Sequence, residues 1–211
     1  MAENDREKQI AQDRYYMGIA EAVELGASCL GSKIGAVLVL NNRVIGTGYN
    51  GTPSGFPNCD EKEKGCVRCY DRWLEKQGRV AEMSDPTHTA GQALDRCICV
   101  HAEQNAFITA ARYGIHVEDA FLYTTLNPCF NCLKEAIQAG VKRIVYKNWY
   151  PSKYSTPLKK QYAELVHHLT EGDKTLFEVV GGGQVAELVG DAPPDPFEDD
   201  KESDGLKPEE L

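Results

Sequence analysis

Two short segments carry the residue types and spacing of a metal site with an adjoining acid–base group. His101 and Glu103 are two positions apart, and Cys129 and Cys132 are three positions apart. A Cys-x-x-Cys pair at a helix N-terminus directs both sulfurs to one point, and the helix dipole favours their thiolate form. One histidine and two cysteines give zinc three protein ligands and leave a fourth position for water, which is typical of a catalytic site.

Glu103 has a separate role in this scheme. Zinc lowers the pKa of a bound water toward neutrality, and we expect Glu103 to move that water's proton to a ring nitrogen and then to a leaving amine. His-x-Glu followed by Pro-Cys-x-x-Cys is the layout of zinc-dependent base deaminases. A lone Cys-x-x-Cys is often a structural half-site or a redox pair, and a lone His-Ala-Glu is usually helix surface. The two motifs together indicate a hydrolytic deaminase.

The elements that must position these residues alternate along the chain. Apolar periodicity and turn residues predict helices over 8–28, 101–112, 132–139 and 156–169, and strands over 34–40, 44–49, 121–125, 141–146 and 176–180. Pro128 stands where a helix can begin. Asn41-Asn42 offers the turn of a β-hairpin between the first two strands. The alternation favours an α/β fold, a three-layer α/β/α sandwich with one mixed sheet of about five strands.

The charge of the chain is concentrated at its C-terminal end. The 211 residues carry −9, and the segment from Gly190 to Leu211, with nine acids and two lysines, accounts for −7 of it. The other 189 residues carry a net charge of −2, and a protein that binds long nucleic acid would be expected to have a basic surface instead. No apolar run reaches the roughly 18 residues of a membrane span, and the first residues are charged, so we expect a cytoplasmic protein without membrane contact. We expect residues 1–188 to form one domain and 189–211 an acidic, disordered tail.

Four segments of the chain are similar in sequence to a known family. They are Gly35–Val39, Gly48–Gly55, His101–Ala106 and Thr125–Cys132. In these segments the chain resembles the deoxycytidylate (dCMP) deaminase family of the cytidine deaminase-like superfamily. The resemblance implies a cytidine deaminase-like sandwich that hydrolyses dCMP to dUMP and ammonia, supplying dUMP for thymidylate synthesis. It implies His101, Cys129 and Cys132 as ligands of a catalytic zinc and Glu103 as the proton shuttle.

The resemblance also implies contacts with nucleotides. The substrate contacts would be Asn50 at the sugar, and Ala102, Thr125, Leu126, Asn127 and Tyr154 near the base. Lys33 is a candidate for the 5′-phosphate, because a dianion needs a cation or several donors, although it reads equally well as a solvated strand edge. Many family members are homohexamers that dCTP activates and dTTP inhibits. By resemblance, the effector residues would be Gly48, Tyr49, Gly51 and Arg112.

Six further cysteines lie at or near a long polar insertion, residues 56–99. Some relatives carry a second, structural zinc, and Cys29, Cys59, Cys66 and Cys97 fall where those relatives place its ligands. Cys69, Cys99 and His88 are alternative ligands, and some of the cysteines can instead be small buried residues. A closed tetrahedral site would tie the insertion to the first helix and to the segment entering His101.

Other functions remain open at this stage. The insertion lies close to the expected pocket, so the substrate can be another cytosine compound, such as dCTP, a modified dCMP or cytidine. An enzyme that edits tRNA or DNA fits poorly, because the chain lacks an aromatic and basic surface run. A zinc-held binding protein without turnover is the alternative from another class, and the intact Glu103 argues against it.

Overall fold

The computed structural model describes residues 3–61, 65–85, 96–148, 156–170, 177–181 and 184–186. Its helices are α1 (Glu3–Glu24), α2 (Val67–Lys76), the 3-10 helix η2 (Val80–Glu82), α3 (Ala102–Arg112), α4 (Phe130–Gln138) and α5 (Thr156–Thr170). Its strands are β1 (Gly35–Leu40), β2 (Arg43–Tyr49), β3 (Phe121–Leu126), β4 (Arg143–Asn148), β5 (Phe177–Gly181) and β6 (Gln184–Ala186). The expected boundary at 188, the acidic tail 189–211, His88 and Tyr154 lie outside the described residues.

One mixed sheet organises the described part of the chain. Its strands lie in the order β2-β1-β3-β4-β5-β6. The pairs β1–β2, β1–β3 and β5–β6 are antiparallel, while β3, β4 and β5 run parallel. The expected mixed sheet is confirmed, and the short strand β6 is an addition that the sequence did not predict.

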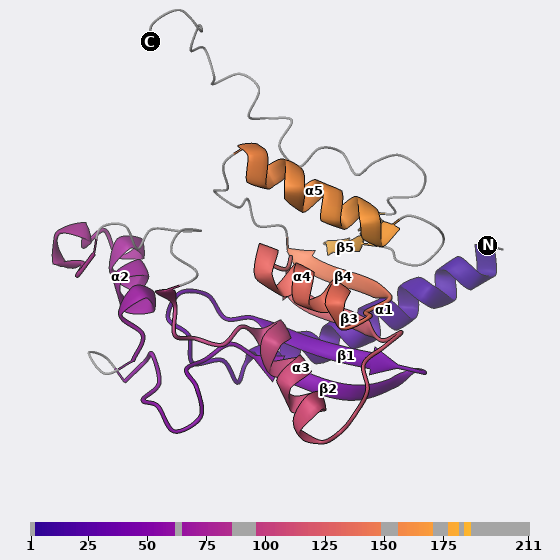
Figure 1. Ribbon diagram of the computed structural model, residues 1–211, viewed down its shortest axis with the longest axis horizontal. Coiled ribbons are helices and arrows are strands. Elements are labelled where there is room, and N and C mark those ends of the chain that lie inside the picture. The colour runs from indigo at the N-terminus through magenta and orange to yellow at the C-terminus, as the bar shows by residue number, and fades with distance from the viewer. Residues whose placement is uncertain are drawn as a thin grey trace, which may run out of the picture.

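Helices cover both faces of this sheet, so the expected three-layer sandwich is also confirmed (Figure 1). On one face, Tyr16, Met17 and Ala20 of α1 pack against alternate residues of the strands, among them Val37 and Tyr123. On the other face, the intervening strand residues form a second cluster with α3, α4 and α5. This alternation follows from the two-residue period of a strand, and it gives each strand one face for each helical layer.

The first helix differs from the expectation in its bounds and in its buried face. It begins at Glu3 and ends at Glu24, whereas the sequence predicted 8–28. The apolar spacing suggested Tyr15 as a core residue, but its side chain is 64% exposed and its neighbour Tyr16 is 6% exposed. The buried face of the helix is therefore shifted by one residue from the predicted face. The ring of Tyr16, not that of Tyr15, packs against the ring of Tyr123, with 5.2 Å between their centroids.

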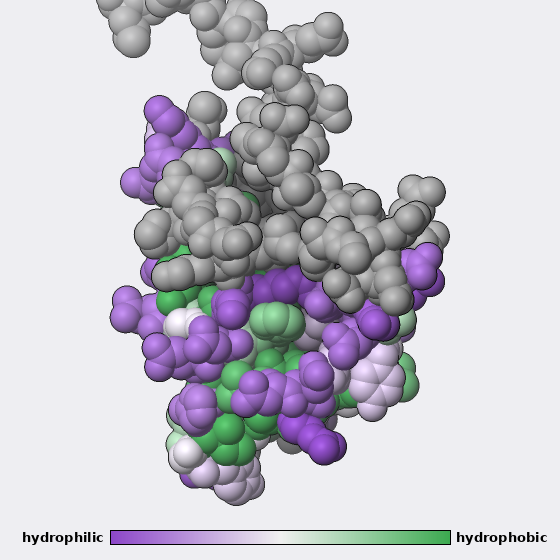
Figure 2. Space-filling view, turned by 90° about the vertical axis from the view of Figure 1, so that its right-hand side faces the viewer, coloured by the Kyte–Doolittle hydropathy of each residue, from purple (hydrophilic) through white to green (hydrophobic). Residues whose placement is uncertain are grey.

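The predicted hairpin is confirmed at its turn. Asn41 and Asn42 both have positive φ, 50° and 59°, as a type I′ turn requires, and asparagine tolerates this conformation better than most residues. Figure 2 views the molecule from the side on which this turn lies in Figure 1, and below the grey atoms an apolar area is bordered by hydrophilic residues. Among the described residues, no helix is long and apolar enough to cross a membrane.

Part of the long insertion has regular structure of its own. Helix α2 occupies Val67–Lys76 and projects away from the sheet, at the left of Figure 1. The carboxylate of Asp71 in α2 accepts hydrogen bonds from the backbone amides of Ser84 and Asp85, at 2.8 and 3.1 Å. These two bonds hold the end of the following turn against the helix.

Candidate active site

Two helix N-termini bring the two motifs together. His101 is the N-cap of α3, and Cys129 is the N-cap of α4, with Cys132 in the first turn of that helix. Helix α4 begins at Phe130, two residues after Pro128, so the predicted start at Pro128 was slightly early. Strand β3 leads into α4 through residues 127–129, and this places both cysteines beside the start of α3.

The side chains of these three residues converge on one point. His101 Nδ1 lies 3.4 Å from Cys129 Sγ and 3.4 Å from Cys132 Sγ. Zn–N bonds of about 2.0 Å and Zn–S bonds of about 2.3 Å at tetrahedral angles require a separation of about 3.5 Å between the donor atoms. One nitrogen and two sulfurs also form a donor set that suits zinc. The predicted trio His101, Cys129 and Cys132 therefore fits a zinc ion.

Glu103 lies beside this trio on the first turn of α3, and only 3% of its surface is exposed. Burial raises the pKa of its carboxyl to about 7, since the charged form loses water. The group of donor atoms within reach of one ion comprises His101, Cys129 and Cys132. Glu103 thus lies next to the metal ligands and is not one of them.

Three supporting residues were not identified from the sequence. The backbone amide of His101 donates to Gln104 Oε1 at 3.1 Å, and Gln104 Nε2 donates to Glu135 Oε1 of α4 at 3.0 Å. The hydroxyl of Tyr162 in α5 donates to the carbonyl oxygen of Pro128 at 2.7 Å. These bonds fix the two helix starts relative to each other. Gln104 could have been found, because glutamine three residues after an N-cap is typical of a capping box.

Asn50, the expected sugar contact, is buried at the end of β2 and holds its own loop. Its Oδ1 accepts a hydrogen bond from the Ile34 amide at 2.8 Å, and its Nδ2 donates to the Ser32 carbonyl at 2.7 Å. An asparagine amide has two N–H groups and an oxygen with two lone pairs, so one donor and one acceptor position remain beyond these two bonds. Lys33 lies between the two bonded residues and is exposed.

The expected base contacts lie at the end of β3. Thr125 is buried, and its hydroxyl oxygen accepts a hydrogen bond from the Gly35 amide at 3.1 Å. The carbonyl oxygen of Thr125 accepts from Asn148 Nδ2 at 2.9 Å, and the amide of Asn127 donates to the Asn148 carbonyl at 2.9 Å. Leu126 is half-buried, and Ala102 is fully buried at the start of α3. The segment 125–127 is therefore fixed by β1 and β4 just before the metal ligands of α4.

A hollow of about 440 Å³ lies beside the expected effector residues. Gly48, Tyr49 and Gly51 line it, together with residues 52–56 and with Asn105 and Thr109 of α3. Asn105 Nδ2 donates to the Tyr49 carbonyl at 2.7 Å and so joins this loop to the catalytic helix. Arg112 is exposed at the far end of α3 and is not among the lining residues.

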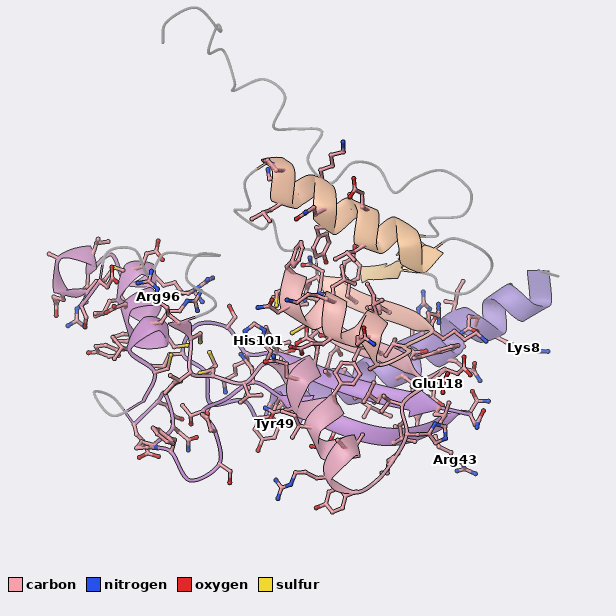
Figure 3. All side chains as sticks on the ribbon, in the orientation of Figure 1. Lys8, Arg43, Tyr49, Arg96, His101 and Glu118 are labelled. Carbon is pink, nitrogen blue, oxygen red and sulfur yellow. The ribbon has the colours of Figure 1, made fainter. Side chains whose placement is uncertain are left out.

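The remaining cysteines do not form the single set of four that was expected. The thiols form two overlapping groups of four. One group contains Cys29, Cys59, Cys69 and Cys99, and the other contains Cys66, Cys69, Cys97 and Cys99. The two residues named as alternatives, Cys69 and Cys99, thus belong to both groups. Figure 3 shows sulfur atoms gathered in two places, beside His101 and at the base of α2.

Comparison with known proteins agrees with this arrangement. Residues 10–148 match the family described as the cytidine and deoxycytidylate deaminase zinc-binding region. The deoxycytidylate deaminase of Schizosaccharomyces pombe is 38% identical over 138 residues, which cover 65% of this chain and 37% of the relative. The deoxycytidylate deaminase of Mycobacterium phage D29 is 39% identical over 134 residues, 64% of this chain and 92% of the relative. The chain thus spans less than half the length of the fission yeast relative.

A solved structure shares the fold. The crystal structure of dCMP deaminase from the cyanophage S-TIM5, in complex with dCMP and dUMP, aligns with a TM-score of 0.52 and 27% identity. The alignment covers 86% of this chain and 99% of that chain. It therefore extends over almost the whole of the phage protein.

Proposed function

The chain belongs to the cytidine and deoxycytidylate deaminase family, and on that premise we propose that it converts dCMP and water into dUMP and ammonia. The metal of this family is zinc, and the donor set fits it. The observation that carries the proposal is the convergence of His101, Cys129 and Cys132 beside the buried carboxyl of Glu103. Relatives at 38% and 39% identity are deoxycytidylate deaminases, which favours dCMP among the cytosine compounds.

The reaction needs a nucleophile, a proton shuttle and an orienting pocket. His101, Cys129 and Cys132 would hold the zinc, which would supply the nucleophile by lowering the pKa of a water molecule. Glu103 accepts one proton from the attacking water and passes it to the ring nitrogen. It then accepts the second proton, from the hydroxyl now on the ring carbon, and passes it to the amine, so that the C–N bond breaks and ammonia leaves. Its burial excludes bulk water from the carboxyl, so protons pass between Glu103 and the substrate rather than to solvent.

Substrate orientation is assigned to the segments that border the trio. The free donor and acceptor positions of Asn50 suit a sugar hydroxyl. Backbone groups at Ala102 and in residues 125–127 suit the polar edge of the base, since β1 and β4 hold that segment rigid. The exposed cation of Lys33 beside the Asn50 loop suits the 5′-phosphate. Tyr154 completes the proposed set.

Regulation by nucleotides is also proposed. The hollow beside Gly48, Tyr49 and Gly51 has a volume suited to a nucleotide, and Asn105 connects it to the helix that carries Glu103. Occupation of the hollow by dCTP or dTTP would therefore act on the start of α3. With Arg112 as a further contact, this regulation would operate in a homohexamer. The enzyme would work in the cytoplasm, where its eight cysteines, none of them in a disulfide, stay reduced, and there it would supply dUMP for thymidylate synthesis.

A panel of substrates tests the proposal. Purified protein is incubated with dCMP, dCTP, deoxycytidine and cytidine, and ammonia release is followed. We expect the largest kcat/KM for dCMP. A higher value for dCTP or cytidine would reassign the substrate, and no turnover with any of the four would leave a zinc-held binding protein as the better description. Repeating the dCMP titration with dCTP and with dTTP tests the effectors, and unchanged curves would refute the regulation.

A further inference from the structure

Six buried or half-buried cysteines form a cluster that the deamination reaction does not use. They are Cys29, Cys59, Cys66, Cys69, Cys97 and Cys99, and we call them the six-cysteine cluster. They come from four separate segments: the loop after α1, the loop before α2, the start of α2, and the approach to α3. Segments so far apart in sequence need a strong local interaction to bring their thiols together.

The sulfur–sulfur distances identify the kind of interaction. Neighbouring sulfurs lie 3.2 Å apart for Cys59–Cys99, 3.5 Å for Cys29–Cys69 and 3.6 Å for Cys69–Cys99. A disulfide would require about 2.05 Å. Two thiolates on one tetrahedral zinc, with Zn–S bonds of about 2.3 Å, lie roughly 3.8 Å apart. The cluster therefore has the spacing of metal ligands rather than that of disulfide partners.

The grouping of the sulfurs indicates how many ions they hold. Each of the two groups contains four sulfurs within reach of one ion, which is the complement of a closed structural zinc site. Cys69 and Cys99 belong to both groups. A thiolate sulfur has enough lone pairs to bind two ions at once. Six cysteines can thus complete two tetrahedra that share an edge, and neither Cys69 nor Cys99 is surplus.

We propose that the six-cysteine cluster binds two zinc ions, with the sulfurs of Cys69 and Cys99 bridging them. Cys29 and Cys59 complete the first ion, and Cys66 and Cys97 complete the second. The proposal concerns metal content and architecture only, so it stands independently of which nucleotide the enzyme deaminates.

Local charges favour this assignment. Six thiolates and two Zn²⁺ ions leave a net charge of about −2, which needs compensation in a buried place. Cys66 is the N-cap of α2, and Cys69 lies in its first turn, where the helix dipole stabilises negative charge. Arg68, on the same turn, adds a positive charge to this part of the chain and is only 5% exposed. Lys76, at the end of α2, donates to the Gly31 carbonyl in the loop after Cys29.

Backbone atoms also pack closely around the six-cysteine cluster. A Cβ on Gly65 would lie 2.5 Å from the Asn58 carbonyl oxygen and 2.5 Å from the Cα of Cys59. Only glycine allows these two loops to approach in this way. A Cβ on Gly31 would lie 3.5 Å from the sulfur of Cys29. The loops are thus fitted around the sulfurs on two sides.

The cluster also fixes the entry to the catalytic site. Cys99 precedes His101 by two residues, and the residue between them, Val100, pairs with Gly51 through hydrogen bonds of 2.9 and 3.3 Å. Gly51 follows Asn50 directly. Loss of the bridging sulfurs would therefore release the backbone on both sides of the pocket, and the catalytic zinc would bind less tightly.

Metal counting on the full chain tests the proposal. Protein purified under reducing conditions is analysed by elemental mass spectrometry and by native mass spectrometry. We expect about three zinc ions per chain, one catalytic and two in the cluster. Cys132→Ser should lower the count by one and leave the cluster intact. Cys29→Ser or Cys66→Ser should remove one of the two cluster ions. Cys69→Ser or Cys99→Ser should remove both ions, since each of these sulfurs would bridge them.

Cadmium NMR tests the bridge without any variant, in case the cysteine variants fail to fold. After exchange of zinc for ¹¹³Cd, we expect two cluster resonances that are split by coupling to each other through the shared sulfurs. The catalytic site should give a third, unsplit resonance. A count of two ions per chain, two unsplit cluster resonances, or disulfides among these cysteines in active protein would overturn the proposal.

Discussion

A Cβ placed on Gly48 would lie 2.1 Å from the carbonyl oxygen of Ala102, the first residue of α3. It would also lie 2.4 Å from the amide nitrogen of Ala106. Strand β2 and the helix that carries Glu103 are therefore in direct backbone contact, and position 48 admits only glycine. The sequence associated Gly48 with an effector site, but its packing role is independent of any effector.

Replacing Gly48 by alanine should displace the start of α3. A methyl group cannot be accommodated at 2.1 Å from a backbone atom, so the helix must shift and His101 with it. We expect a loss of about 1–3 kcal/mol in the free energy of unfolding, together with reduced catalytic zinc. Denaturant unfolding and metal analysis measure the two effects. Gly18→Ala is the matched control, because nothing lies within 4 Å of a Cβ there. Equal stability of the two variants would contradict this account.

Glu103→Gln should abolish turnover while the metal remains bound. The amide keeps the shape of the side chain but cannot carry protons, so we expect kcat for dCMP to fall by about 10²- to 10⁴-fold. Zinc content should not change, since Glu103 is not one of the ligands. Steady-state kinetics and metal analysis check both points. Glu135→Gln, a carboxyl that accepts from Gln104 nearby, should keep most of the activity. An active Glu103→Gln variant would refute the proton-shuttle role.

Asn50→Asp should weaken the loop that borders the pocket. The substitution removes the donor to the Ser32 carbonyl and places a carboxylate against that oxygen. We expect a cost of about 1–3 kcal/mol in stability and a larger rise in KM for dCMP than fall in kcat. Thermal unfolding and dCMP saturation curves provide the measurements. A variant with wild-type KM would show that Asn50 serves the loop alone.

Arg143→Met should destabilise the protein without changing its chemistry. Arg143 forms a buried two-point ion pair with Asp13 at 2.6 and 2.8 Å, and the Tyr123 hydroxyl donates to the same carboxylate at 2.8 Å. Removing one partner leaves a buried charge, which costs about 3–5 kcal/mol. The pair lies on the α1 face, away from the metal ligands, so kcat at low temperature should be preserved. In contrast, Glu82→Gln, in an exposed pair with Arg79, should shift the unfolding midpoint little. A comparable shift in both variants would contradict the assignment.

The catalytic trio and the sheet could be predicted from the sequence because short-range signals mark them. The asparagine pair at 41–42 marks the hairpin, and motif spacing marks His101, Cys129 and Cys132. Helix α2 has a helical period, since its charged residues Arg68, Asp71, Arg72 and Glu75 share one face, but the insertion was not expected to contain a helix. The burial of Arg68 and Asp71 does not follow from hydropathy, because charged side chains normally face solvent. The grouping of the thiols brings together segments far apart in sequence, such as Cys29 with Cys69 and Cys59 with Cys99, 40 positions apart in each case, and spacing along the chain does not determine these contacts.

The ion pair between Asp13 and Arg143 has a consequence for how the chain is made. The two residues are 130 positions apart, so Asp13 leaves the ribosome long before its partner. At roughly 5–20 residues per second, the delay is on the order of 10 s. During that time α1 cannot dock with its carboxylate paired, because the strand that neutralises it has not been synthesised. Helix α1 therefore cannot complete its docking onto the sheet until β4 has been synthesised.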